Sequence, residues 1–184
     1  MKTIDIRLKP SEIASLKSIV GKQLISINHD PFVFSNTSSQ IVQINTNSDT
    51  FYLYSFTEPI DHFGATEDVA VWSFESERYR AVDRKKFIET PFKETIKSVS
   101  VIQENQQLCK SDEVLYDVWL TRGIIIDFGE HQLSFEKSVW FSEDIRIQKG
   151  YELINKFTPV ADFVNDDWDK GITAKCTREI ITLD

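Results

Sequence analysis

The feature that most constrains the fold is a two-residue period of apolar side chains between Val114 and Ile147. The period runs through Val114, Tyr116, Val118 and Leu120, then Ile124, Ile126 and Phe128, then Leu133 and Phe135, and finally Ile145 and Ile147. Because successive side chains of a strand point to opposite faces of a sheet, this spacing predicts strands. Gly129-Glu130-His131 interrupts the period with the composition of a tight turn. We therefore expect a strand meander with a hairpin at this turn.

The same criteria predict regular structure in much of the remaining chain. Strands are expected at residues 3–9, 24–27, 41–45, 51–56, 69–74, 99–102 and 172–183, the last with a bend near Arg178-Glu179. Pro10 suits a first helical position and apolar residues follow at helical spacing, which predicts a helix at residues 10–20. A second short helix is expected at residues 90–97. Turns or polar connections are expected at residues 28–31, 58–64, 75–87 and 104–113.

These elements predict an α+β fold that is predominantly antiparallel β-sheet with one or two short helices. The chain has 184 residues, which is enough for a single compact domain (1–184) that buries roughly 70% of its unfolded surface. We expect it to need no metal or disulfide for stability.

Weak internal similarity supports a further hypothesis, a tandem duplication with two similar strand-rich halves at about residues 1–80 and 81–184. Three pairs of segments resemble one another in the same order: Leu16-Lys17-Ser18-Ile19 and Ile96-Lys97-Ser98-Val99; Ile44, Phe51, Leu53 and Ile126, Leu133, Phe135; residues 67–71 and 143–147. A duplication would place a shared groove or a flat face between the halves. The alternative is that strand-and-turn segments look alike because they draw on few residue types.

The balance of charge limits the choice of partners. Lys and Arg number 21 against 29 Asp and Glu, so the formal net charge is −8. The isoelectric point is about 5.0. Such a surface repels phosphate backbones and attracts basic proteins, so we expect a basic protein as partner and no nucleic acid. The alternative is acidity that serves solubility alone.

The cysteines and the apolar runs indicate the compartment. Cys109 and Cys176 lack the spacing of a zinc or redox site and are too few for a disulfide framework, so reduced thiols are expected. The first residues lack the apolar core of a signal peptide, and no apolar run approaches the ~20 residues that cross a bilayer. These features predict a cytoplasmic protein without membrane contact.

No motif with a definite chemistry is present. GxSxG, GxGxxG and GxxxxGK[ST] are absent, so acyl transfer and phosphate binding by a glycine-rich loop have no candidate residues. The three histidines are not spaced as a metal pair. The densest group of potential ligands is Asp61, His62, Glu67 and Asp68, a weak candidate for a hard cation, with a solvated polar loop as the alternative. We expect no cofactor, and no motif in the sequence supports a catalytic function.

The tryptophans differ in their surroundings. Three occur within strand patterns and are expected in the core: Trp72, Trp119 and Trp140. Trp168 instead is flanked by Asp166, Asp167 and Asp169 in a segment without periodicity. Because an aromatic anchor ringed by acids suits a contact with a basic protein, these four residues form the candidate partner contact. The alternative is that Trp168 folds back as a lid over the end of the sheet.

Charge, size and the missing motifs together favour a non-catalytic interaction domain. It would bind and mask a basic partner, as an immunity protein masks its toxin. A second hypothesis is a small-ligand-binding β module or enzyme with its site between the two halves. A third is a structural domain whose acidity serves only solubility.

Overall fold

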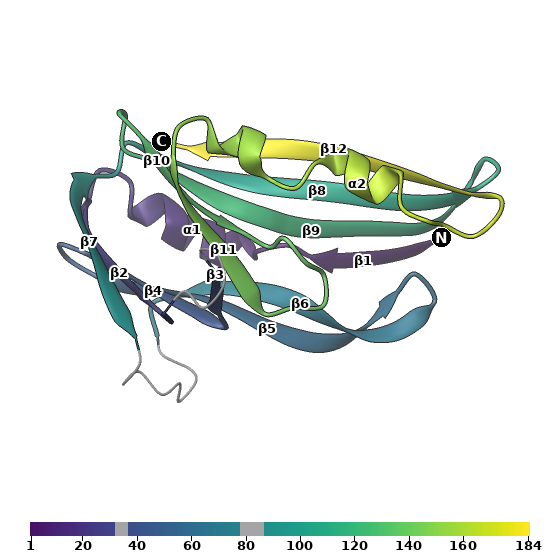
Figure 1. Cartoon of the computed structure of the whole chain (residues 1–184), viewed down its shortest axis with the longest axis horizontal. Helices are drawn as coiled ribbons and strands as arrows, with labels where there is room; N and C mark the ends of the chain where they lie inside the picture. Colours follow the sequence, from purple (N-terminus) through teal and green to yellow (C-terminus); the bar gives the residue numbers. More distant parts are fainter. Residues whose placement is uncertain (32–36, 78–86) are drawn as a thin grey trace.

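Two sheets pack face to face and form the body of the molecule (Figure 1). The computed structural model describes residues 1–31, 37–77 and 87–184, with the backbone alone at Ser39 and His62. Strands predominate among these residues, and the α-helices are short. The predicted fold class, α+β with predominantly antiparallel sheet, is confirmed. Most of the charged connection predicted at residues 75–87 lies outside the described residues.

The larger sheet has seven strands in the described part of the chain, in the order β12-β8-β9-β10-β11-β3, with β1 beside β9. Their bounds are β1 (Lys2–Ile6), β3 (Thr37–Ser39), β8 (Ser98–Lys110), β9 (Glu113–Asp127), β10 (Gln132–Glu136), β11 (Asp144–Gly150) and β12 (Ile172–Leu183). β9 pairs with β8 along its length, with β1 in parallel at its start and with β10 at its end. The predicted meander and its hairpin at residues 128–131 are confirmed.

The smaller sheet has five strands among the described residues, in the order β6-β5-β4-β2-β7. Their bounds are β2 (Gln23–His29), β4 (Ile41–Thr46), β5 (Thr50–His62), β6 (Ala65–Glu75) and β7 (Ile88–Thr95). Neighbouring strands are antiparallel throughout. The hairpin between β4 and β5 closes with the amide of Thr46 donating to the carbonyl of Asp49 at 2.8 Å.

Hydrocarbon side chains from both sheets form the core between them. The residues include Leu24, Ile44, Leu53 and Phe74 from the smaller sheet and Val101, Ile124, Phe135 and Ile145 from the larger one. Each of these residues is buried. Burial of apolar surface stabilises a fold by roughly 25 cal/mol per Å², so this layer is the main contribution that holds the sheets together.

Helix α1 (Pro10–Ser18) lies between the sheets at one end of the molecule (Figure 1). Leu16 and Ile19 on its inner side join the core. The Glu12 carboxylate accepts hydrogen bonds from the amides of Lys9 at 2.5 Å and Phe74 at 3.1 Å. Glu12 thus satisfies the helix start and ties the helix to β6. The helix predicted in this part of the chain is confirmed.

The other face of the larger sheet is covered by a segment that contains η2 (Leu153–Lys156) and α2 (Val160–Val164) (Figure 1). Phe157, between the two, packs against Ile102 of β8. Gly123 of β9 permits this close approach, since a Cβ atom there would lie 2.6 Å from the Phe157 ring.

The helix predicted at residues 90–97 is wrong, because this segment forms strand β7. β7 pairs with β2 from Ile88 to Thr95, with a bulge at Phe92-Lys93. It is an edge strand of the smaller sheet, and an edge tolerates Pro91, whose nitrogen cannot donate to a second neighbour. Pairing with β2 therefore overrides the weak helical signal of Thr90-Pro91.

The polar connection predicted at residues 104–113 is also wrong. β8 continues to Lys110 and β9 begins at Glu113, so that only Ser111 and Asp112 form the turn. The polar residues of β8 can lie inside the sheet because β9 and β12 flank the strand and supply hydrogen-bonding partners.

Three boundaries differ from the sequence-based expectations for the same reason. β5 extends to His62, so the loop expected at residues 58–64 shrinks to Phe63-Gly64. β2 extends to His29, into the turn expected at residues 28–31. β12 keeps one register with β8 throughout, and the bend expected at Arg178-Glu179 is absent from this described strand. In each case the backbone bonds of a neighbouring strand outweigh local composition.

The core positions predicted for the tryptophans are correct in one case. Trp72 is buried. Trp119 is half-buried, with the Arg7 guanidinium 4.6 Å from its ring centroid. Trp140 is also half-buried, and it lies in the turn between β10 and β11 rather than in a strand, because β10 ends at Glu136.

The proposed duplication stays a prediction. Each proposed half contains a three-stranded meander, β4-β5-β6 or β9-β10-β11. Ile44 pairs with Phe51 in the first, and Ile126 pairs with Leu133 in the second. The similar segments at residues 16–19 and 96–99 differ, because the first ends α1 and the second leads into β8.

Candidate functional site

The two polar clusters that the sequence singles out lie at the same end of the molecule. Phe63, at the tip of the β5-β6 hairpin, contacts Trp168 with 5.5 Å between ring centroids. Asp61, Glu67 and Asp68 belong to the strands of that hairpin. Trp168 lies between α2 and β12. The tertiary structure thus joins residues that are far apart in the sequence.

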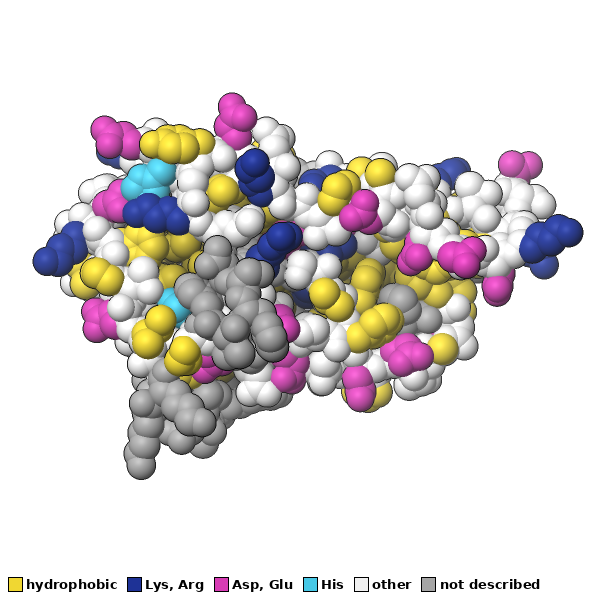
Figure 2. Space-filling view, viewed as in Figure 1, with side chains coloured by type: hydrophobic (Ala, Val, Ile, Leu, Met, Phe, Trp, Pro, Cys, Tyr) yellow, Lys and Arg dark blue, Asp and Glu magenta, His cyan; other side chains and the backbone are white. Residues whose placement is uncertain are grey.

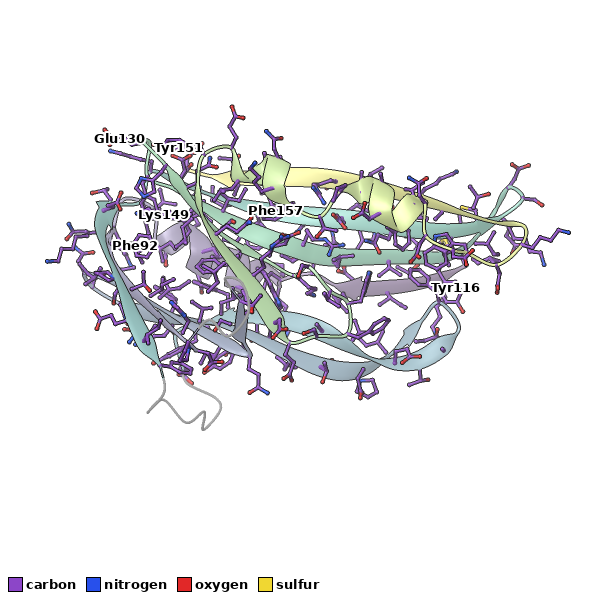
Figure 3. All side chains as sticks on the ribbon, in the orientation of Figure 1. Phe92, Tyr116, Glu130, Lys149, Tyr151 and Phe157 are labelled. Atoms are coloured by element: carbon purple, nitrogen blue, oxygen red, sulfur yellow. The ribbon has the colours of Figure 1, made fainter. Side chains whose placement is uncertain are left out.

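Among the described residues, four aromatic rings lie around Phe63. The centroid distances are 5.5 Å to Tyr116, 6.4 Å to Trp140, 5.7 Å to Phe163 and 5.5 Å to Trp168. Figure 3 shows Tyr116 where β1, β9 and the β5-β6 hairpin meet. We call these five residues the aromatic cluster. Edge-to-face pairs of this kind stabilise a fold by about 0.5–1.5 kcal/mol each. The cluster therefore stabilises the packing of the β5-β6 hairpin against the larger sheet.

Trp168 folds back against the protein. Its indole Nε1 donates a hydrogen bond to the carbonyl of Phe163 at 2.9 Å, and its ring lies 5.1 Å from that of Phe163. The side chain is half-buried. This position agrees with the lid that the sequence offers as an alternative, and it leaves part of the ring on the surface.

Exposed carboxylates belong to both segments that meet in the aromatic cluster. Asp166, Asp167 and Asp169 are exposed beside Trp168, and Glu67 and Asp68 are exposed on β6. Figure 2 shows acidic side chains above and below a band of hydrophobic side chains in the right half of the molecule. We call the aromatic cluster together with these five acids the acidic-aromatic surface.

The remaining members of the predicted cation site have other surroundings. Asp61 pairs with Lys2, and it also accepts the amide of Gly64 at 2.8 Å. The side chain of His62 lies outside the described residues. Within the described part of the chain, no three His, Cys, Asp or Glu residues are grouped so that they could hold a metal ion.

A pocket opens within the acidic-aromatic surface. It has a volume of about 460 Å³. We call it the hairpin pocket, and its lining comprises Phe63, Leu108, Leu115, Tyr116, Asp167, Trp168, Asp169 and Ile172. Its walls are aromatic and aliphatic, and the charged groups that line it are the carboxylates of Asp167 and Asp169.

A buried ionic network lies beneath the segment that contains η2 and α2. The sequence did not indicate it. Glu104 accepts hydrogen bonds from Arg122 at 2.7 Å and from Arg178 at 2.5 Å and 3.0 Å. Burial by itself would raise the pKa of Glu104, but the charges and hydrogen bonds of both arginines outweigh burial, and the pKa lies below its ordinary value. The absence of Gly and Pro from residues 104–113 was the available sign of a strand here.

The network positions the segment that carries part of the acidic-aromatic surface. Arg178 donates to the carbonyl of Thr158 at 2.5 Å, and the amide of Thr158 donates to Glu136 at 2.6 Å. Both backbone groups of Thr158 are thereby held on the larger sheet, immediately before α2 and Trp168. No residue of α2 is itself buried, so these polar contacts contribute much of its placement.

Two further groups near the network have perturbed pKa values. Lys137 is buried, and its Nζ donates to the carbonyl of Ala70 on β6 at 2.6 Å. Burial, and then the charge of Arg122, lower the pKa of Lys137 to about 7. Burial, and then the charge of Glu104, raise the pKa of the Cys176 thiol to about 12. A thiol with such a pKa is a poor nucleophile at neutral pH.

A second pocket lies at the opposite end of the molecule, between the sheets. It has a volume of about 230 Å³. Its lining comes from both sheets: Ile27, His29, Thr90, Phe92, Leu133, Ile147 and Lys149. Figure 3 shows Phe92 and Lys149 at this end, far from Tyr116. The Lys149 ammonium lies 5.0 Å from the Phe92 ring centroid and 3.5 Å from the Glu94 carboxylate.

Comparison of the chain with protein-family models, with curated proteins and with solved structures found no match. No helix in the described residues is long and apolar enough to cross a membrane. The interpretation of the site therefore depends on its own geometry and chemistry.

Proposed function

We propose that this chain is a non-catalytic interaction domain that binds a basic protein through the acidic-aromatic surface. One observation carries the proposal: the contact between Phe63 and Trp168 brings the hairpin that bears Glu67 and Asp68 against the segment that bears three exposed aspartates. Aromatic anchors contribute most of the energy of many protein interfaces. Carboxylates around them attract a basic partner and speed its association.

The charge of the whole chain supports the same conclusion. A net charge of −8 produces a field that favours basic partners over acidic ones. The most concrete form of the proposal is a protein that masks a basic toxin in the cytoplasm, the compartment that the sequence predicts. Masking needs affinity and steric cover but no catalytic group.

The experiment compares three forms of the immobilised chain. They are the wild type, the triple variant Asp166→Asn, Asp167→Asn, Asp169→Asn, and a control variant with the same change of charge at exposed acids elsewhere, Glu89→Gln, Glu130→Gln, Glu152→Gln. Each is incubated with the proteins of its own cells at low and high salt, and mass spectrometry quantifies what is retained.

The proposal expects a basic protein that the wild type and the control retain at low salt. The triple variant should bind it at least about tenfold more weakly, and high salt should release it. Equal retention by the triple variant would contradict the proposal, as would retention that salt does not change. Failure to retain any protein would also count against it.

A second candidate function, small-ligand binding, has the pocket between the sheets in its favour. Its largely apolar lining and the Lys149 ammonium at one side, which a ligand would share with Glu94, suit an amphipathic carboxylate. Medium-chain carboxylic acids should then raise the midpoint of thermal unfolding, and Ile147→Trp, which fills the pocket, should abolish the increase. If no acid in the series shifts the wild-type midpoint, this candidate is wrong.

A further inference from the structure

The lining of the hairpin pocket restricts what it can bind. Leu108, Leu115 and Ile172 provide an aliphatic part, and Phe63, Tyr116 and Trp168 provide aromatic rings. Asp167 and Asp169 add two carboxylates, and no lysine or arginine among the described residues lines the pocket. A ligand with an apolar stem and a cationic head satisfies both parts of this lining.

Among cationic side chains, arginine fits this combination best. Its guanidinium is planar and weakly hydrated, so it stacks on aromatic rings more readily than the compact ammonium of lysine does. It also presents several N–H groups, which can engage both carboxylates at once. Its three methylene groups can lie along the aliphatic residues.

The backbone turn that carries Asp167 and Asp169 is formed before any partner arrives. The amide of Trp168 donates to the carbonyl of Asp166 at 2.9 Å, and the amide of Ile172 donates to the carbonyl of Asp169 at 3.0 Å. Gly171 has a φ of 86°, a conformation that glycine adopts without strain and that completes this turn. Because the Trp168 indole is fixed by its own hydrogen bond to Phe163, this ring loses little freedom on binding.

We propose that the hairpin pocket binds an arginine side chain of the partner, an inference that rests on the proposed function and specifies its central contact. The guanidinium stacks on the aromatic rings and pairs with Asp167 and Asp169. The pocket, at about 460 Å³, also has room for the residues next to the arginine.

The probe is a short peptide with one central arginine in an otherwise neutral sequence. Its counterparts carry citrulline, which has the same shape without the charge, or lysine at that position. The indole N–H resonance of Trp168, followed by NMR in the whole chain, reports binding next to the pocket. The expected result is a shift of this resonance with the arginine peptide and at least about tenfold weaker binding of the citrulline and lysine peptides.

The double variant Asp167→Asn, Asp169→Asn tests the carboxylates. Both side chains are exposed, so the fold should persist, and the remaining indole resonances of the four tryptophans provide the check. Affinity for the arginine peptide should fall about tenfold, whereas Glu130→Gln, Glu152→Gln should leave it unchanged. Equal binding of the three peptides overturns the inference, as does a double variant that binds like the wild type.

The two proposals fail in different ways. If the triple variant loses a basic partner from cells but the peptides are not discriminated, the arginine contact is wrong and the interaction domain stands. If the triple variant retains its partner, the proposed function itself is wrong.

Discussion

The two faces of the larger sheet differ in the side chains that they bury. The face toward the smaller sheet carries hydrocarbon, such as Ile124 and Phe135. The face beneath η2 and α2 combines a small apolar group around Phe157 with the ionic network, in which Glu104 is 1% exposed and Arg122 is 5% exposed. On one face of the sheet the contacts are therefore mainly apolar and non-directional. On the other face, polar contacts with a defined geometry are added.

This difference explains how the acidic-aromatic surface is built. Apolar contacts hold the sheets together but tolerate small changes of position. Hydrogen bonds to charged groups are directional and short. The bond that Thr158 accepts from Arg178 and the bond that it donates to Glu136 fix this residue just before α2. The hydrocarbon face thus contributes most of the stability, and the ionic face positions the segment that leads to Trp168 and its acids.

The largest effect is expected on the hydrocarbon face. Phe135→Ala removes a fully buried ring and should lower the free energy of unfolding by about 4 kcal/mol. Urea denaturation measures the change. Ile180→Ala, at a side chain that is 53% exposed on β12, should change it by less than about 1 kcal/mol. Equal effects of the two substitutions would contradict the position assigned to the core.

A smaller loss of stability, with a distinct structural effect, is expected on the ionic face. Glu104→Gln leaves Arg122 and Arg178 without a carboxylate and should cost about 3 kcal/mol. Because Arg178 also holds Thr158, the indole N–H resonance of Trp168 should move, whereas Phe135→Ala should leave it in place. Glu179→Gln, exposed on the same strand as Arg178, is the control. If the Trp168 resonance does not move in Glu104→Gln, the ionic network does not position the acidic-aromatic surface.

Lys137 contacts both the ionic network, through Arg122, and the smaller sheet, through Ala70. Its contribution to the free energy of unfolding depends on pH. The folded chain releases this proton at a pKa of about 7, against an ordinary value of 10.5. Between these values the unfolded state binds more protons, so the contribution of Lys137 to stability rises with pH and is lost as pH falls through about 7. Relative to Lys137→Met, the wild type should gain about 2 kcal/mol or more between pH 7 and pH 10. Parallel stability curves for the two proteins would refute the shift.

The smallest effect on stability is expected at the acidic-aromatic surface. The triple variant Asp166→Asn, Asp167→Asn, Asp169→Asn changes exposed side chains and should alter the free energy of unfolding by no more than about 0.5 kcal/mol. Its effect should be on partner binding alone. A loss of several kcal/mol would mean that these acids serve the fold rather than recognition.

Much of the fold could be predicted from local patterns. The predictions that were wrong share a cause. The period of residues 114–147 and the signals around Pro10 are local, and the elements that they predict are confirmed. Residues 104–113 and 90–97 were assigned wrongly because their polar or proline-containing sequences form strands only when a partner strand lies beside them. Composition alone does not reveal that partner.

The candidate site could be predicted only in pieces. The acids around Trp168 and those of the β5-β6 hairpin stand out in the sequence as separate clusters. Their position on one surface depends on the contact between Phe63 and Trp168, and no local pattern encodes that contact. The network of Glu104 was invisible because a charged residue in a sequence is most often solvated.

The sequence by itself determined the alternation that makes strands, the start of α1 and the acidic balance of charge, because these properties belong to neighbouring residues or to their sum. Only the tertiary structure decided which strands pair, which charges are buried and which aromatic rings meet. Those outcomes depend on side chains far apart in the chain that are brought together when the core between the sheets excludes water.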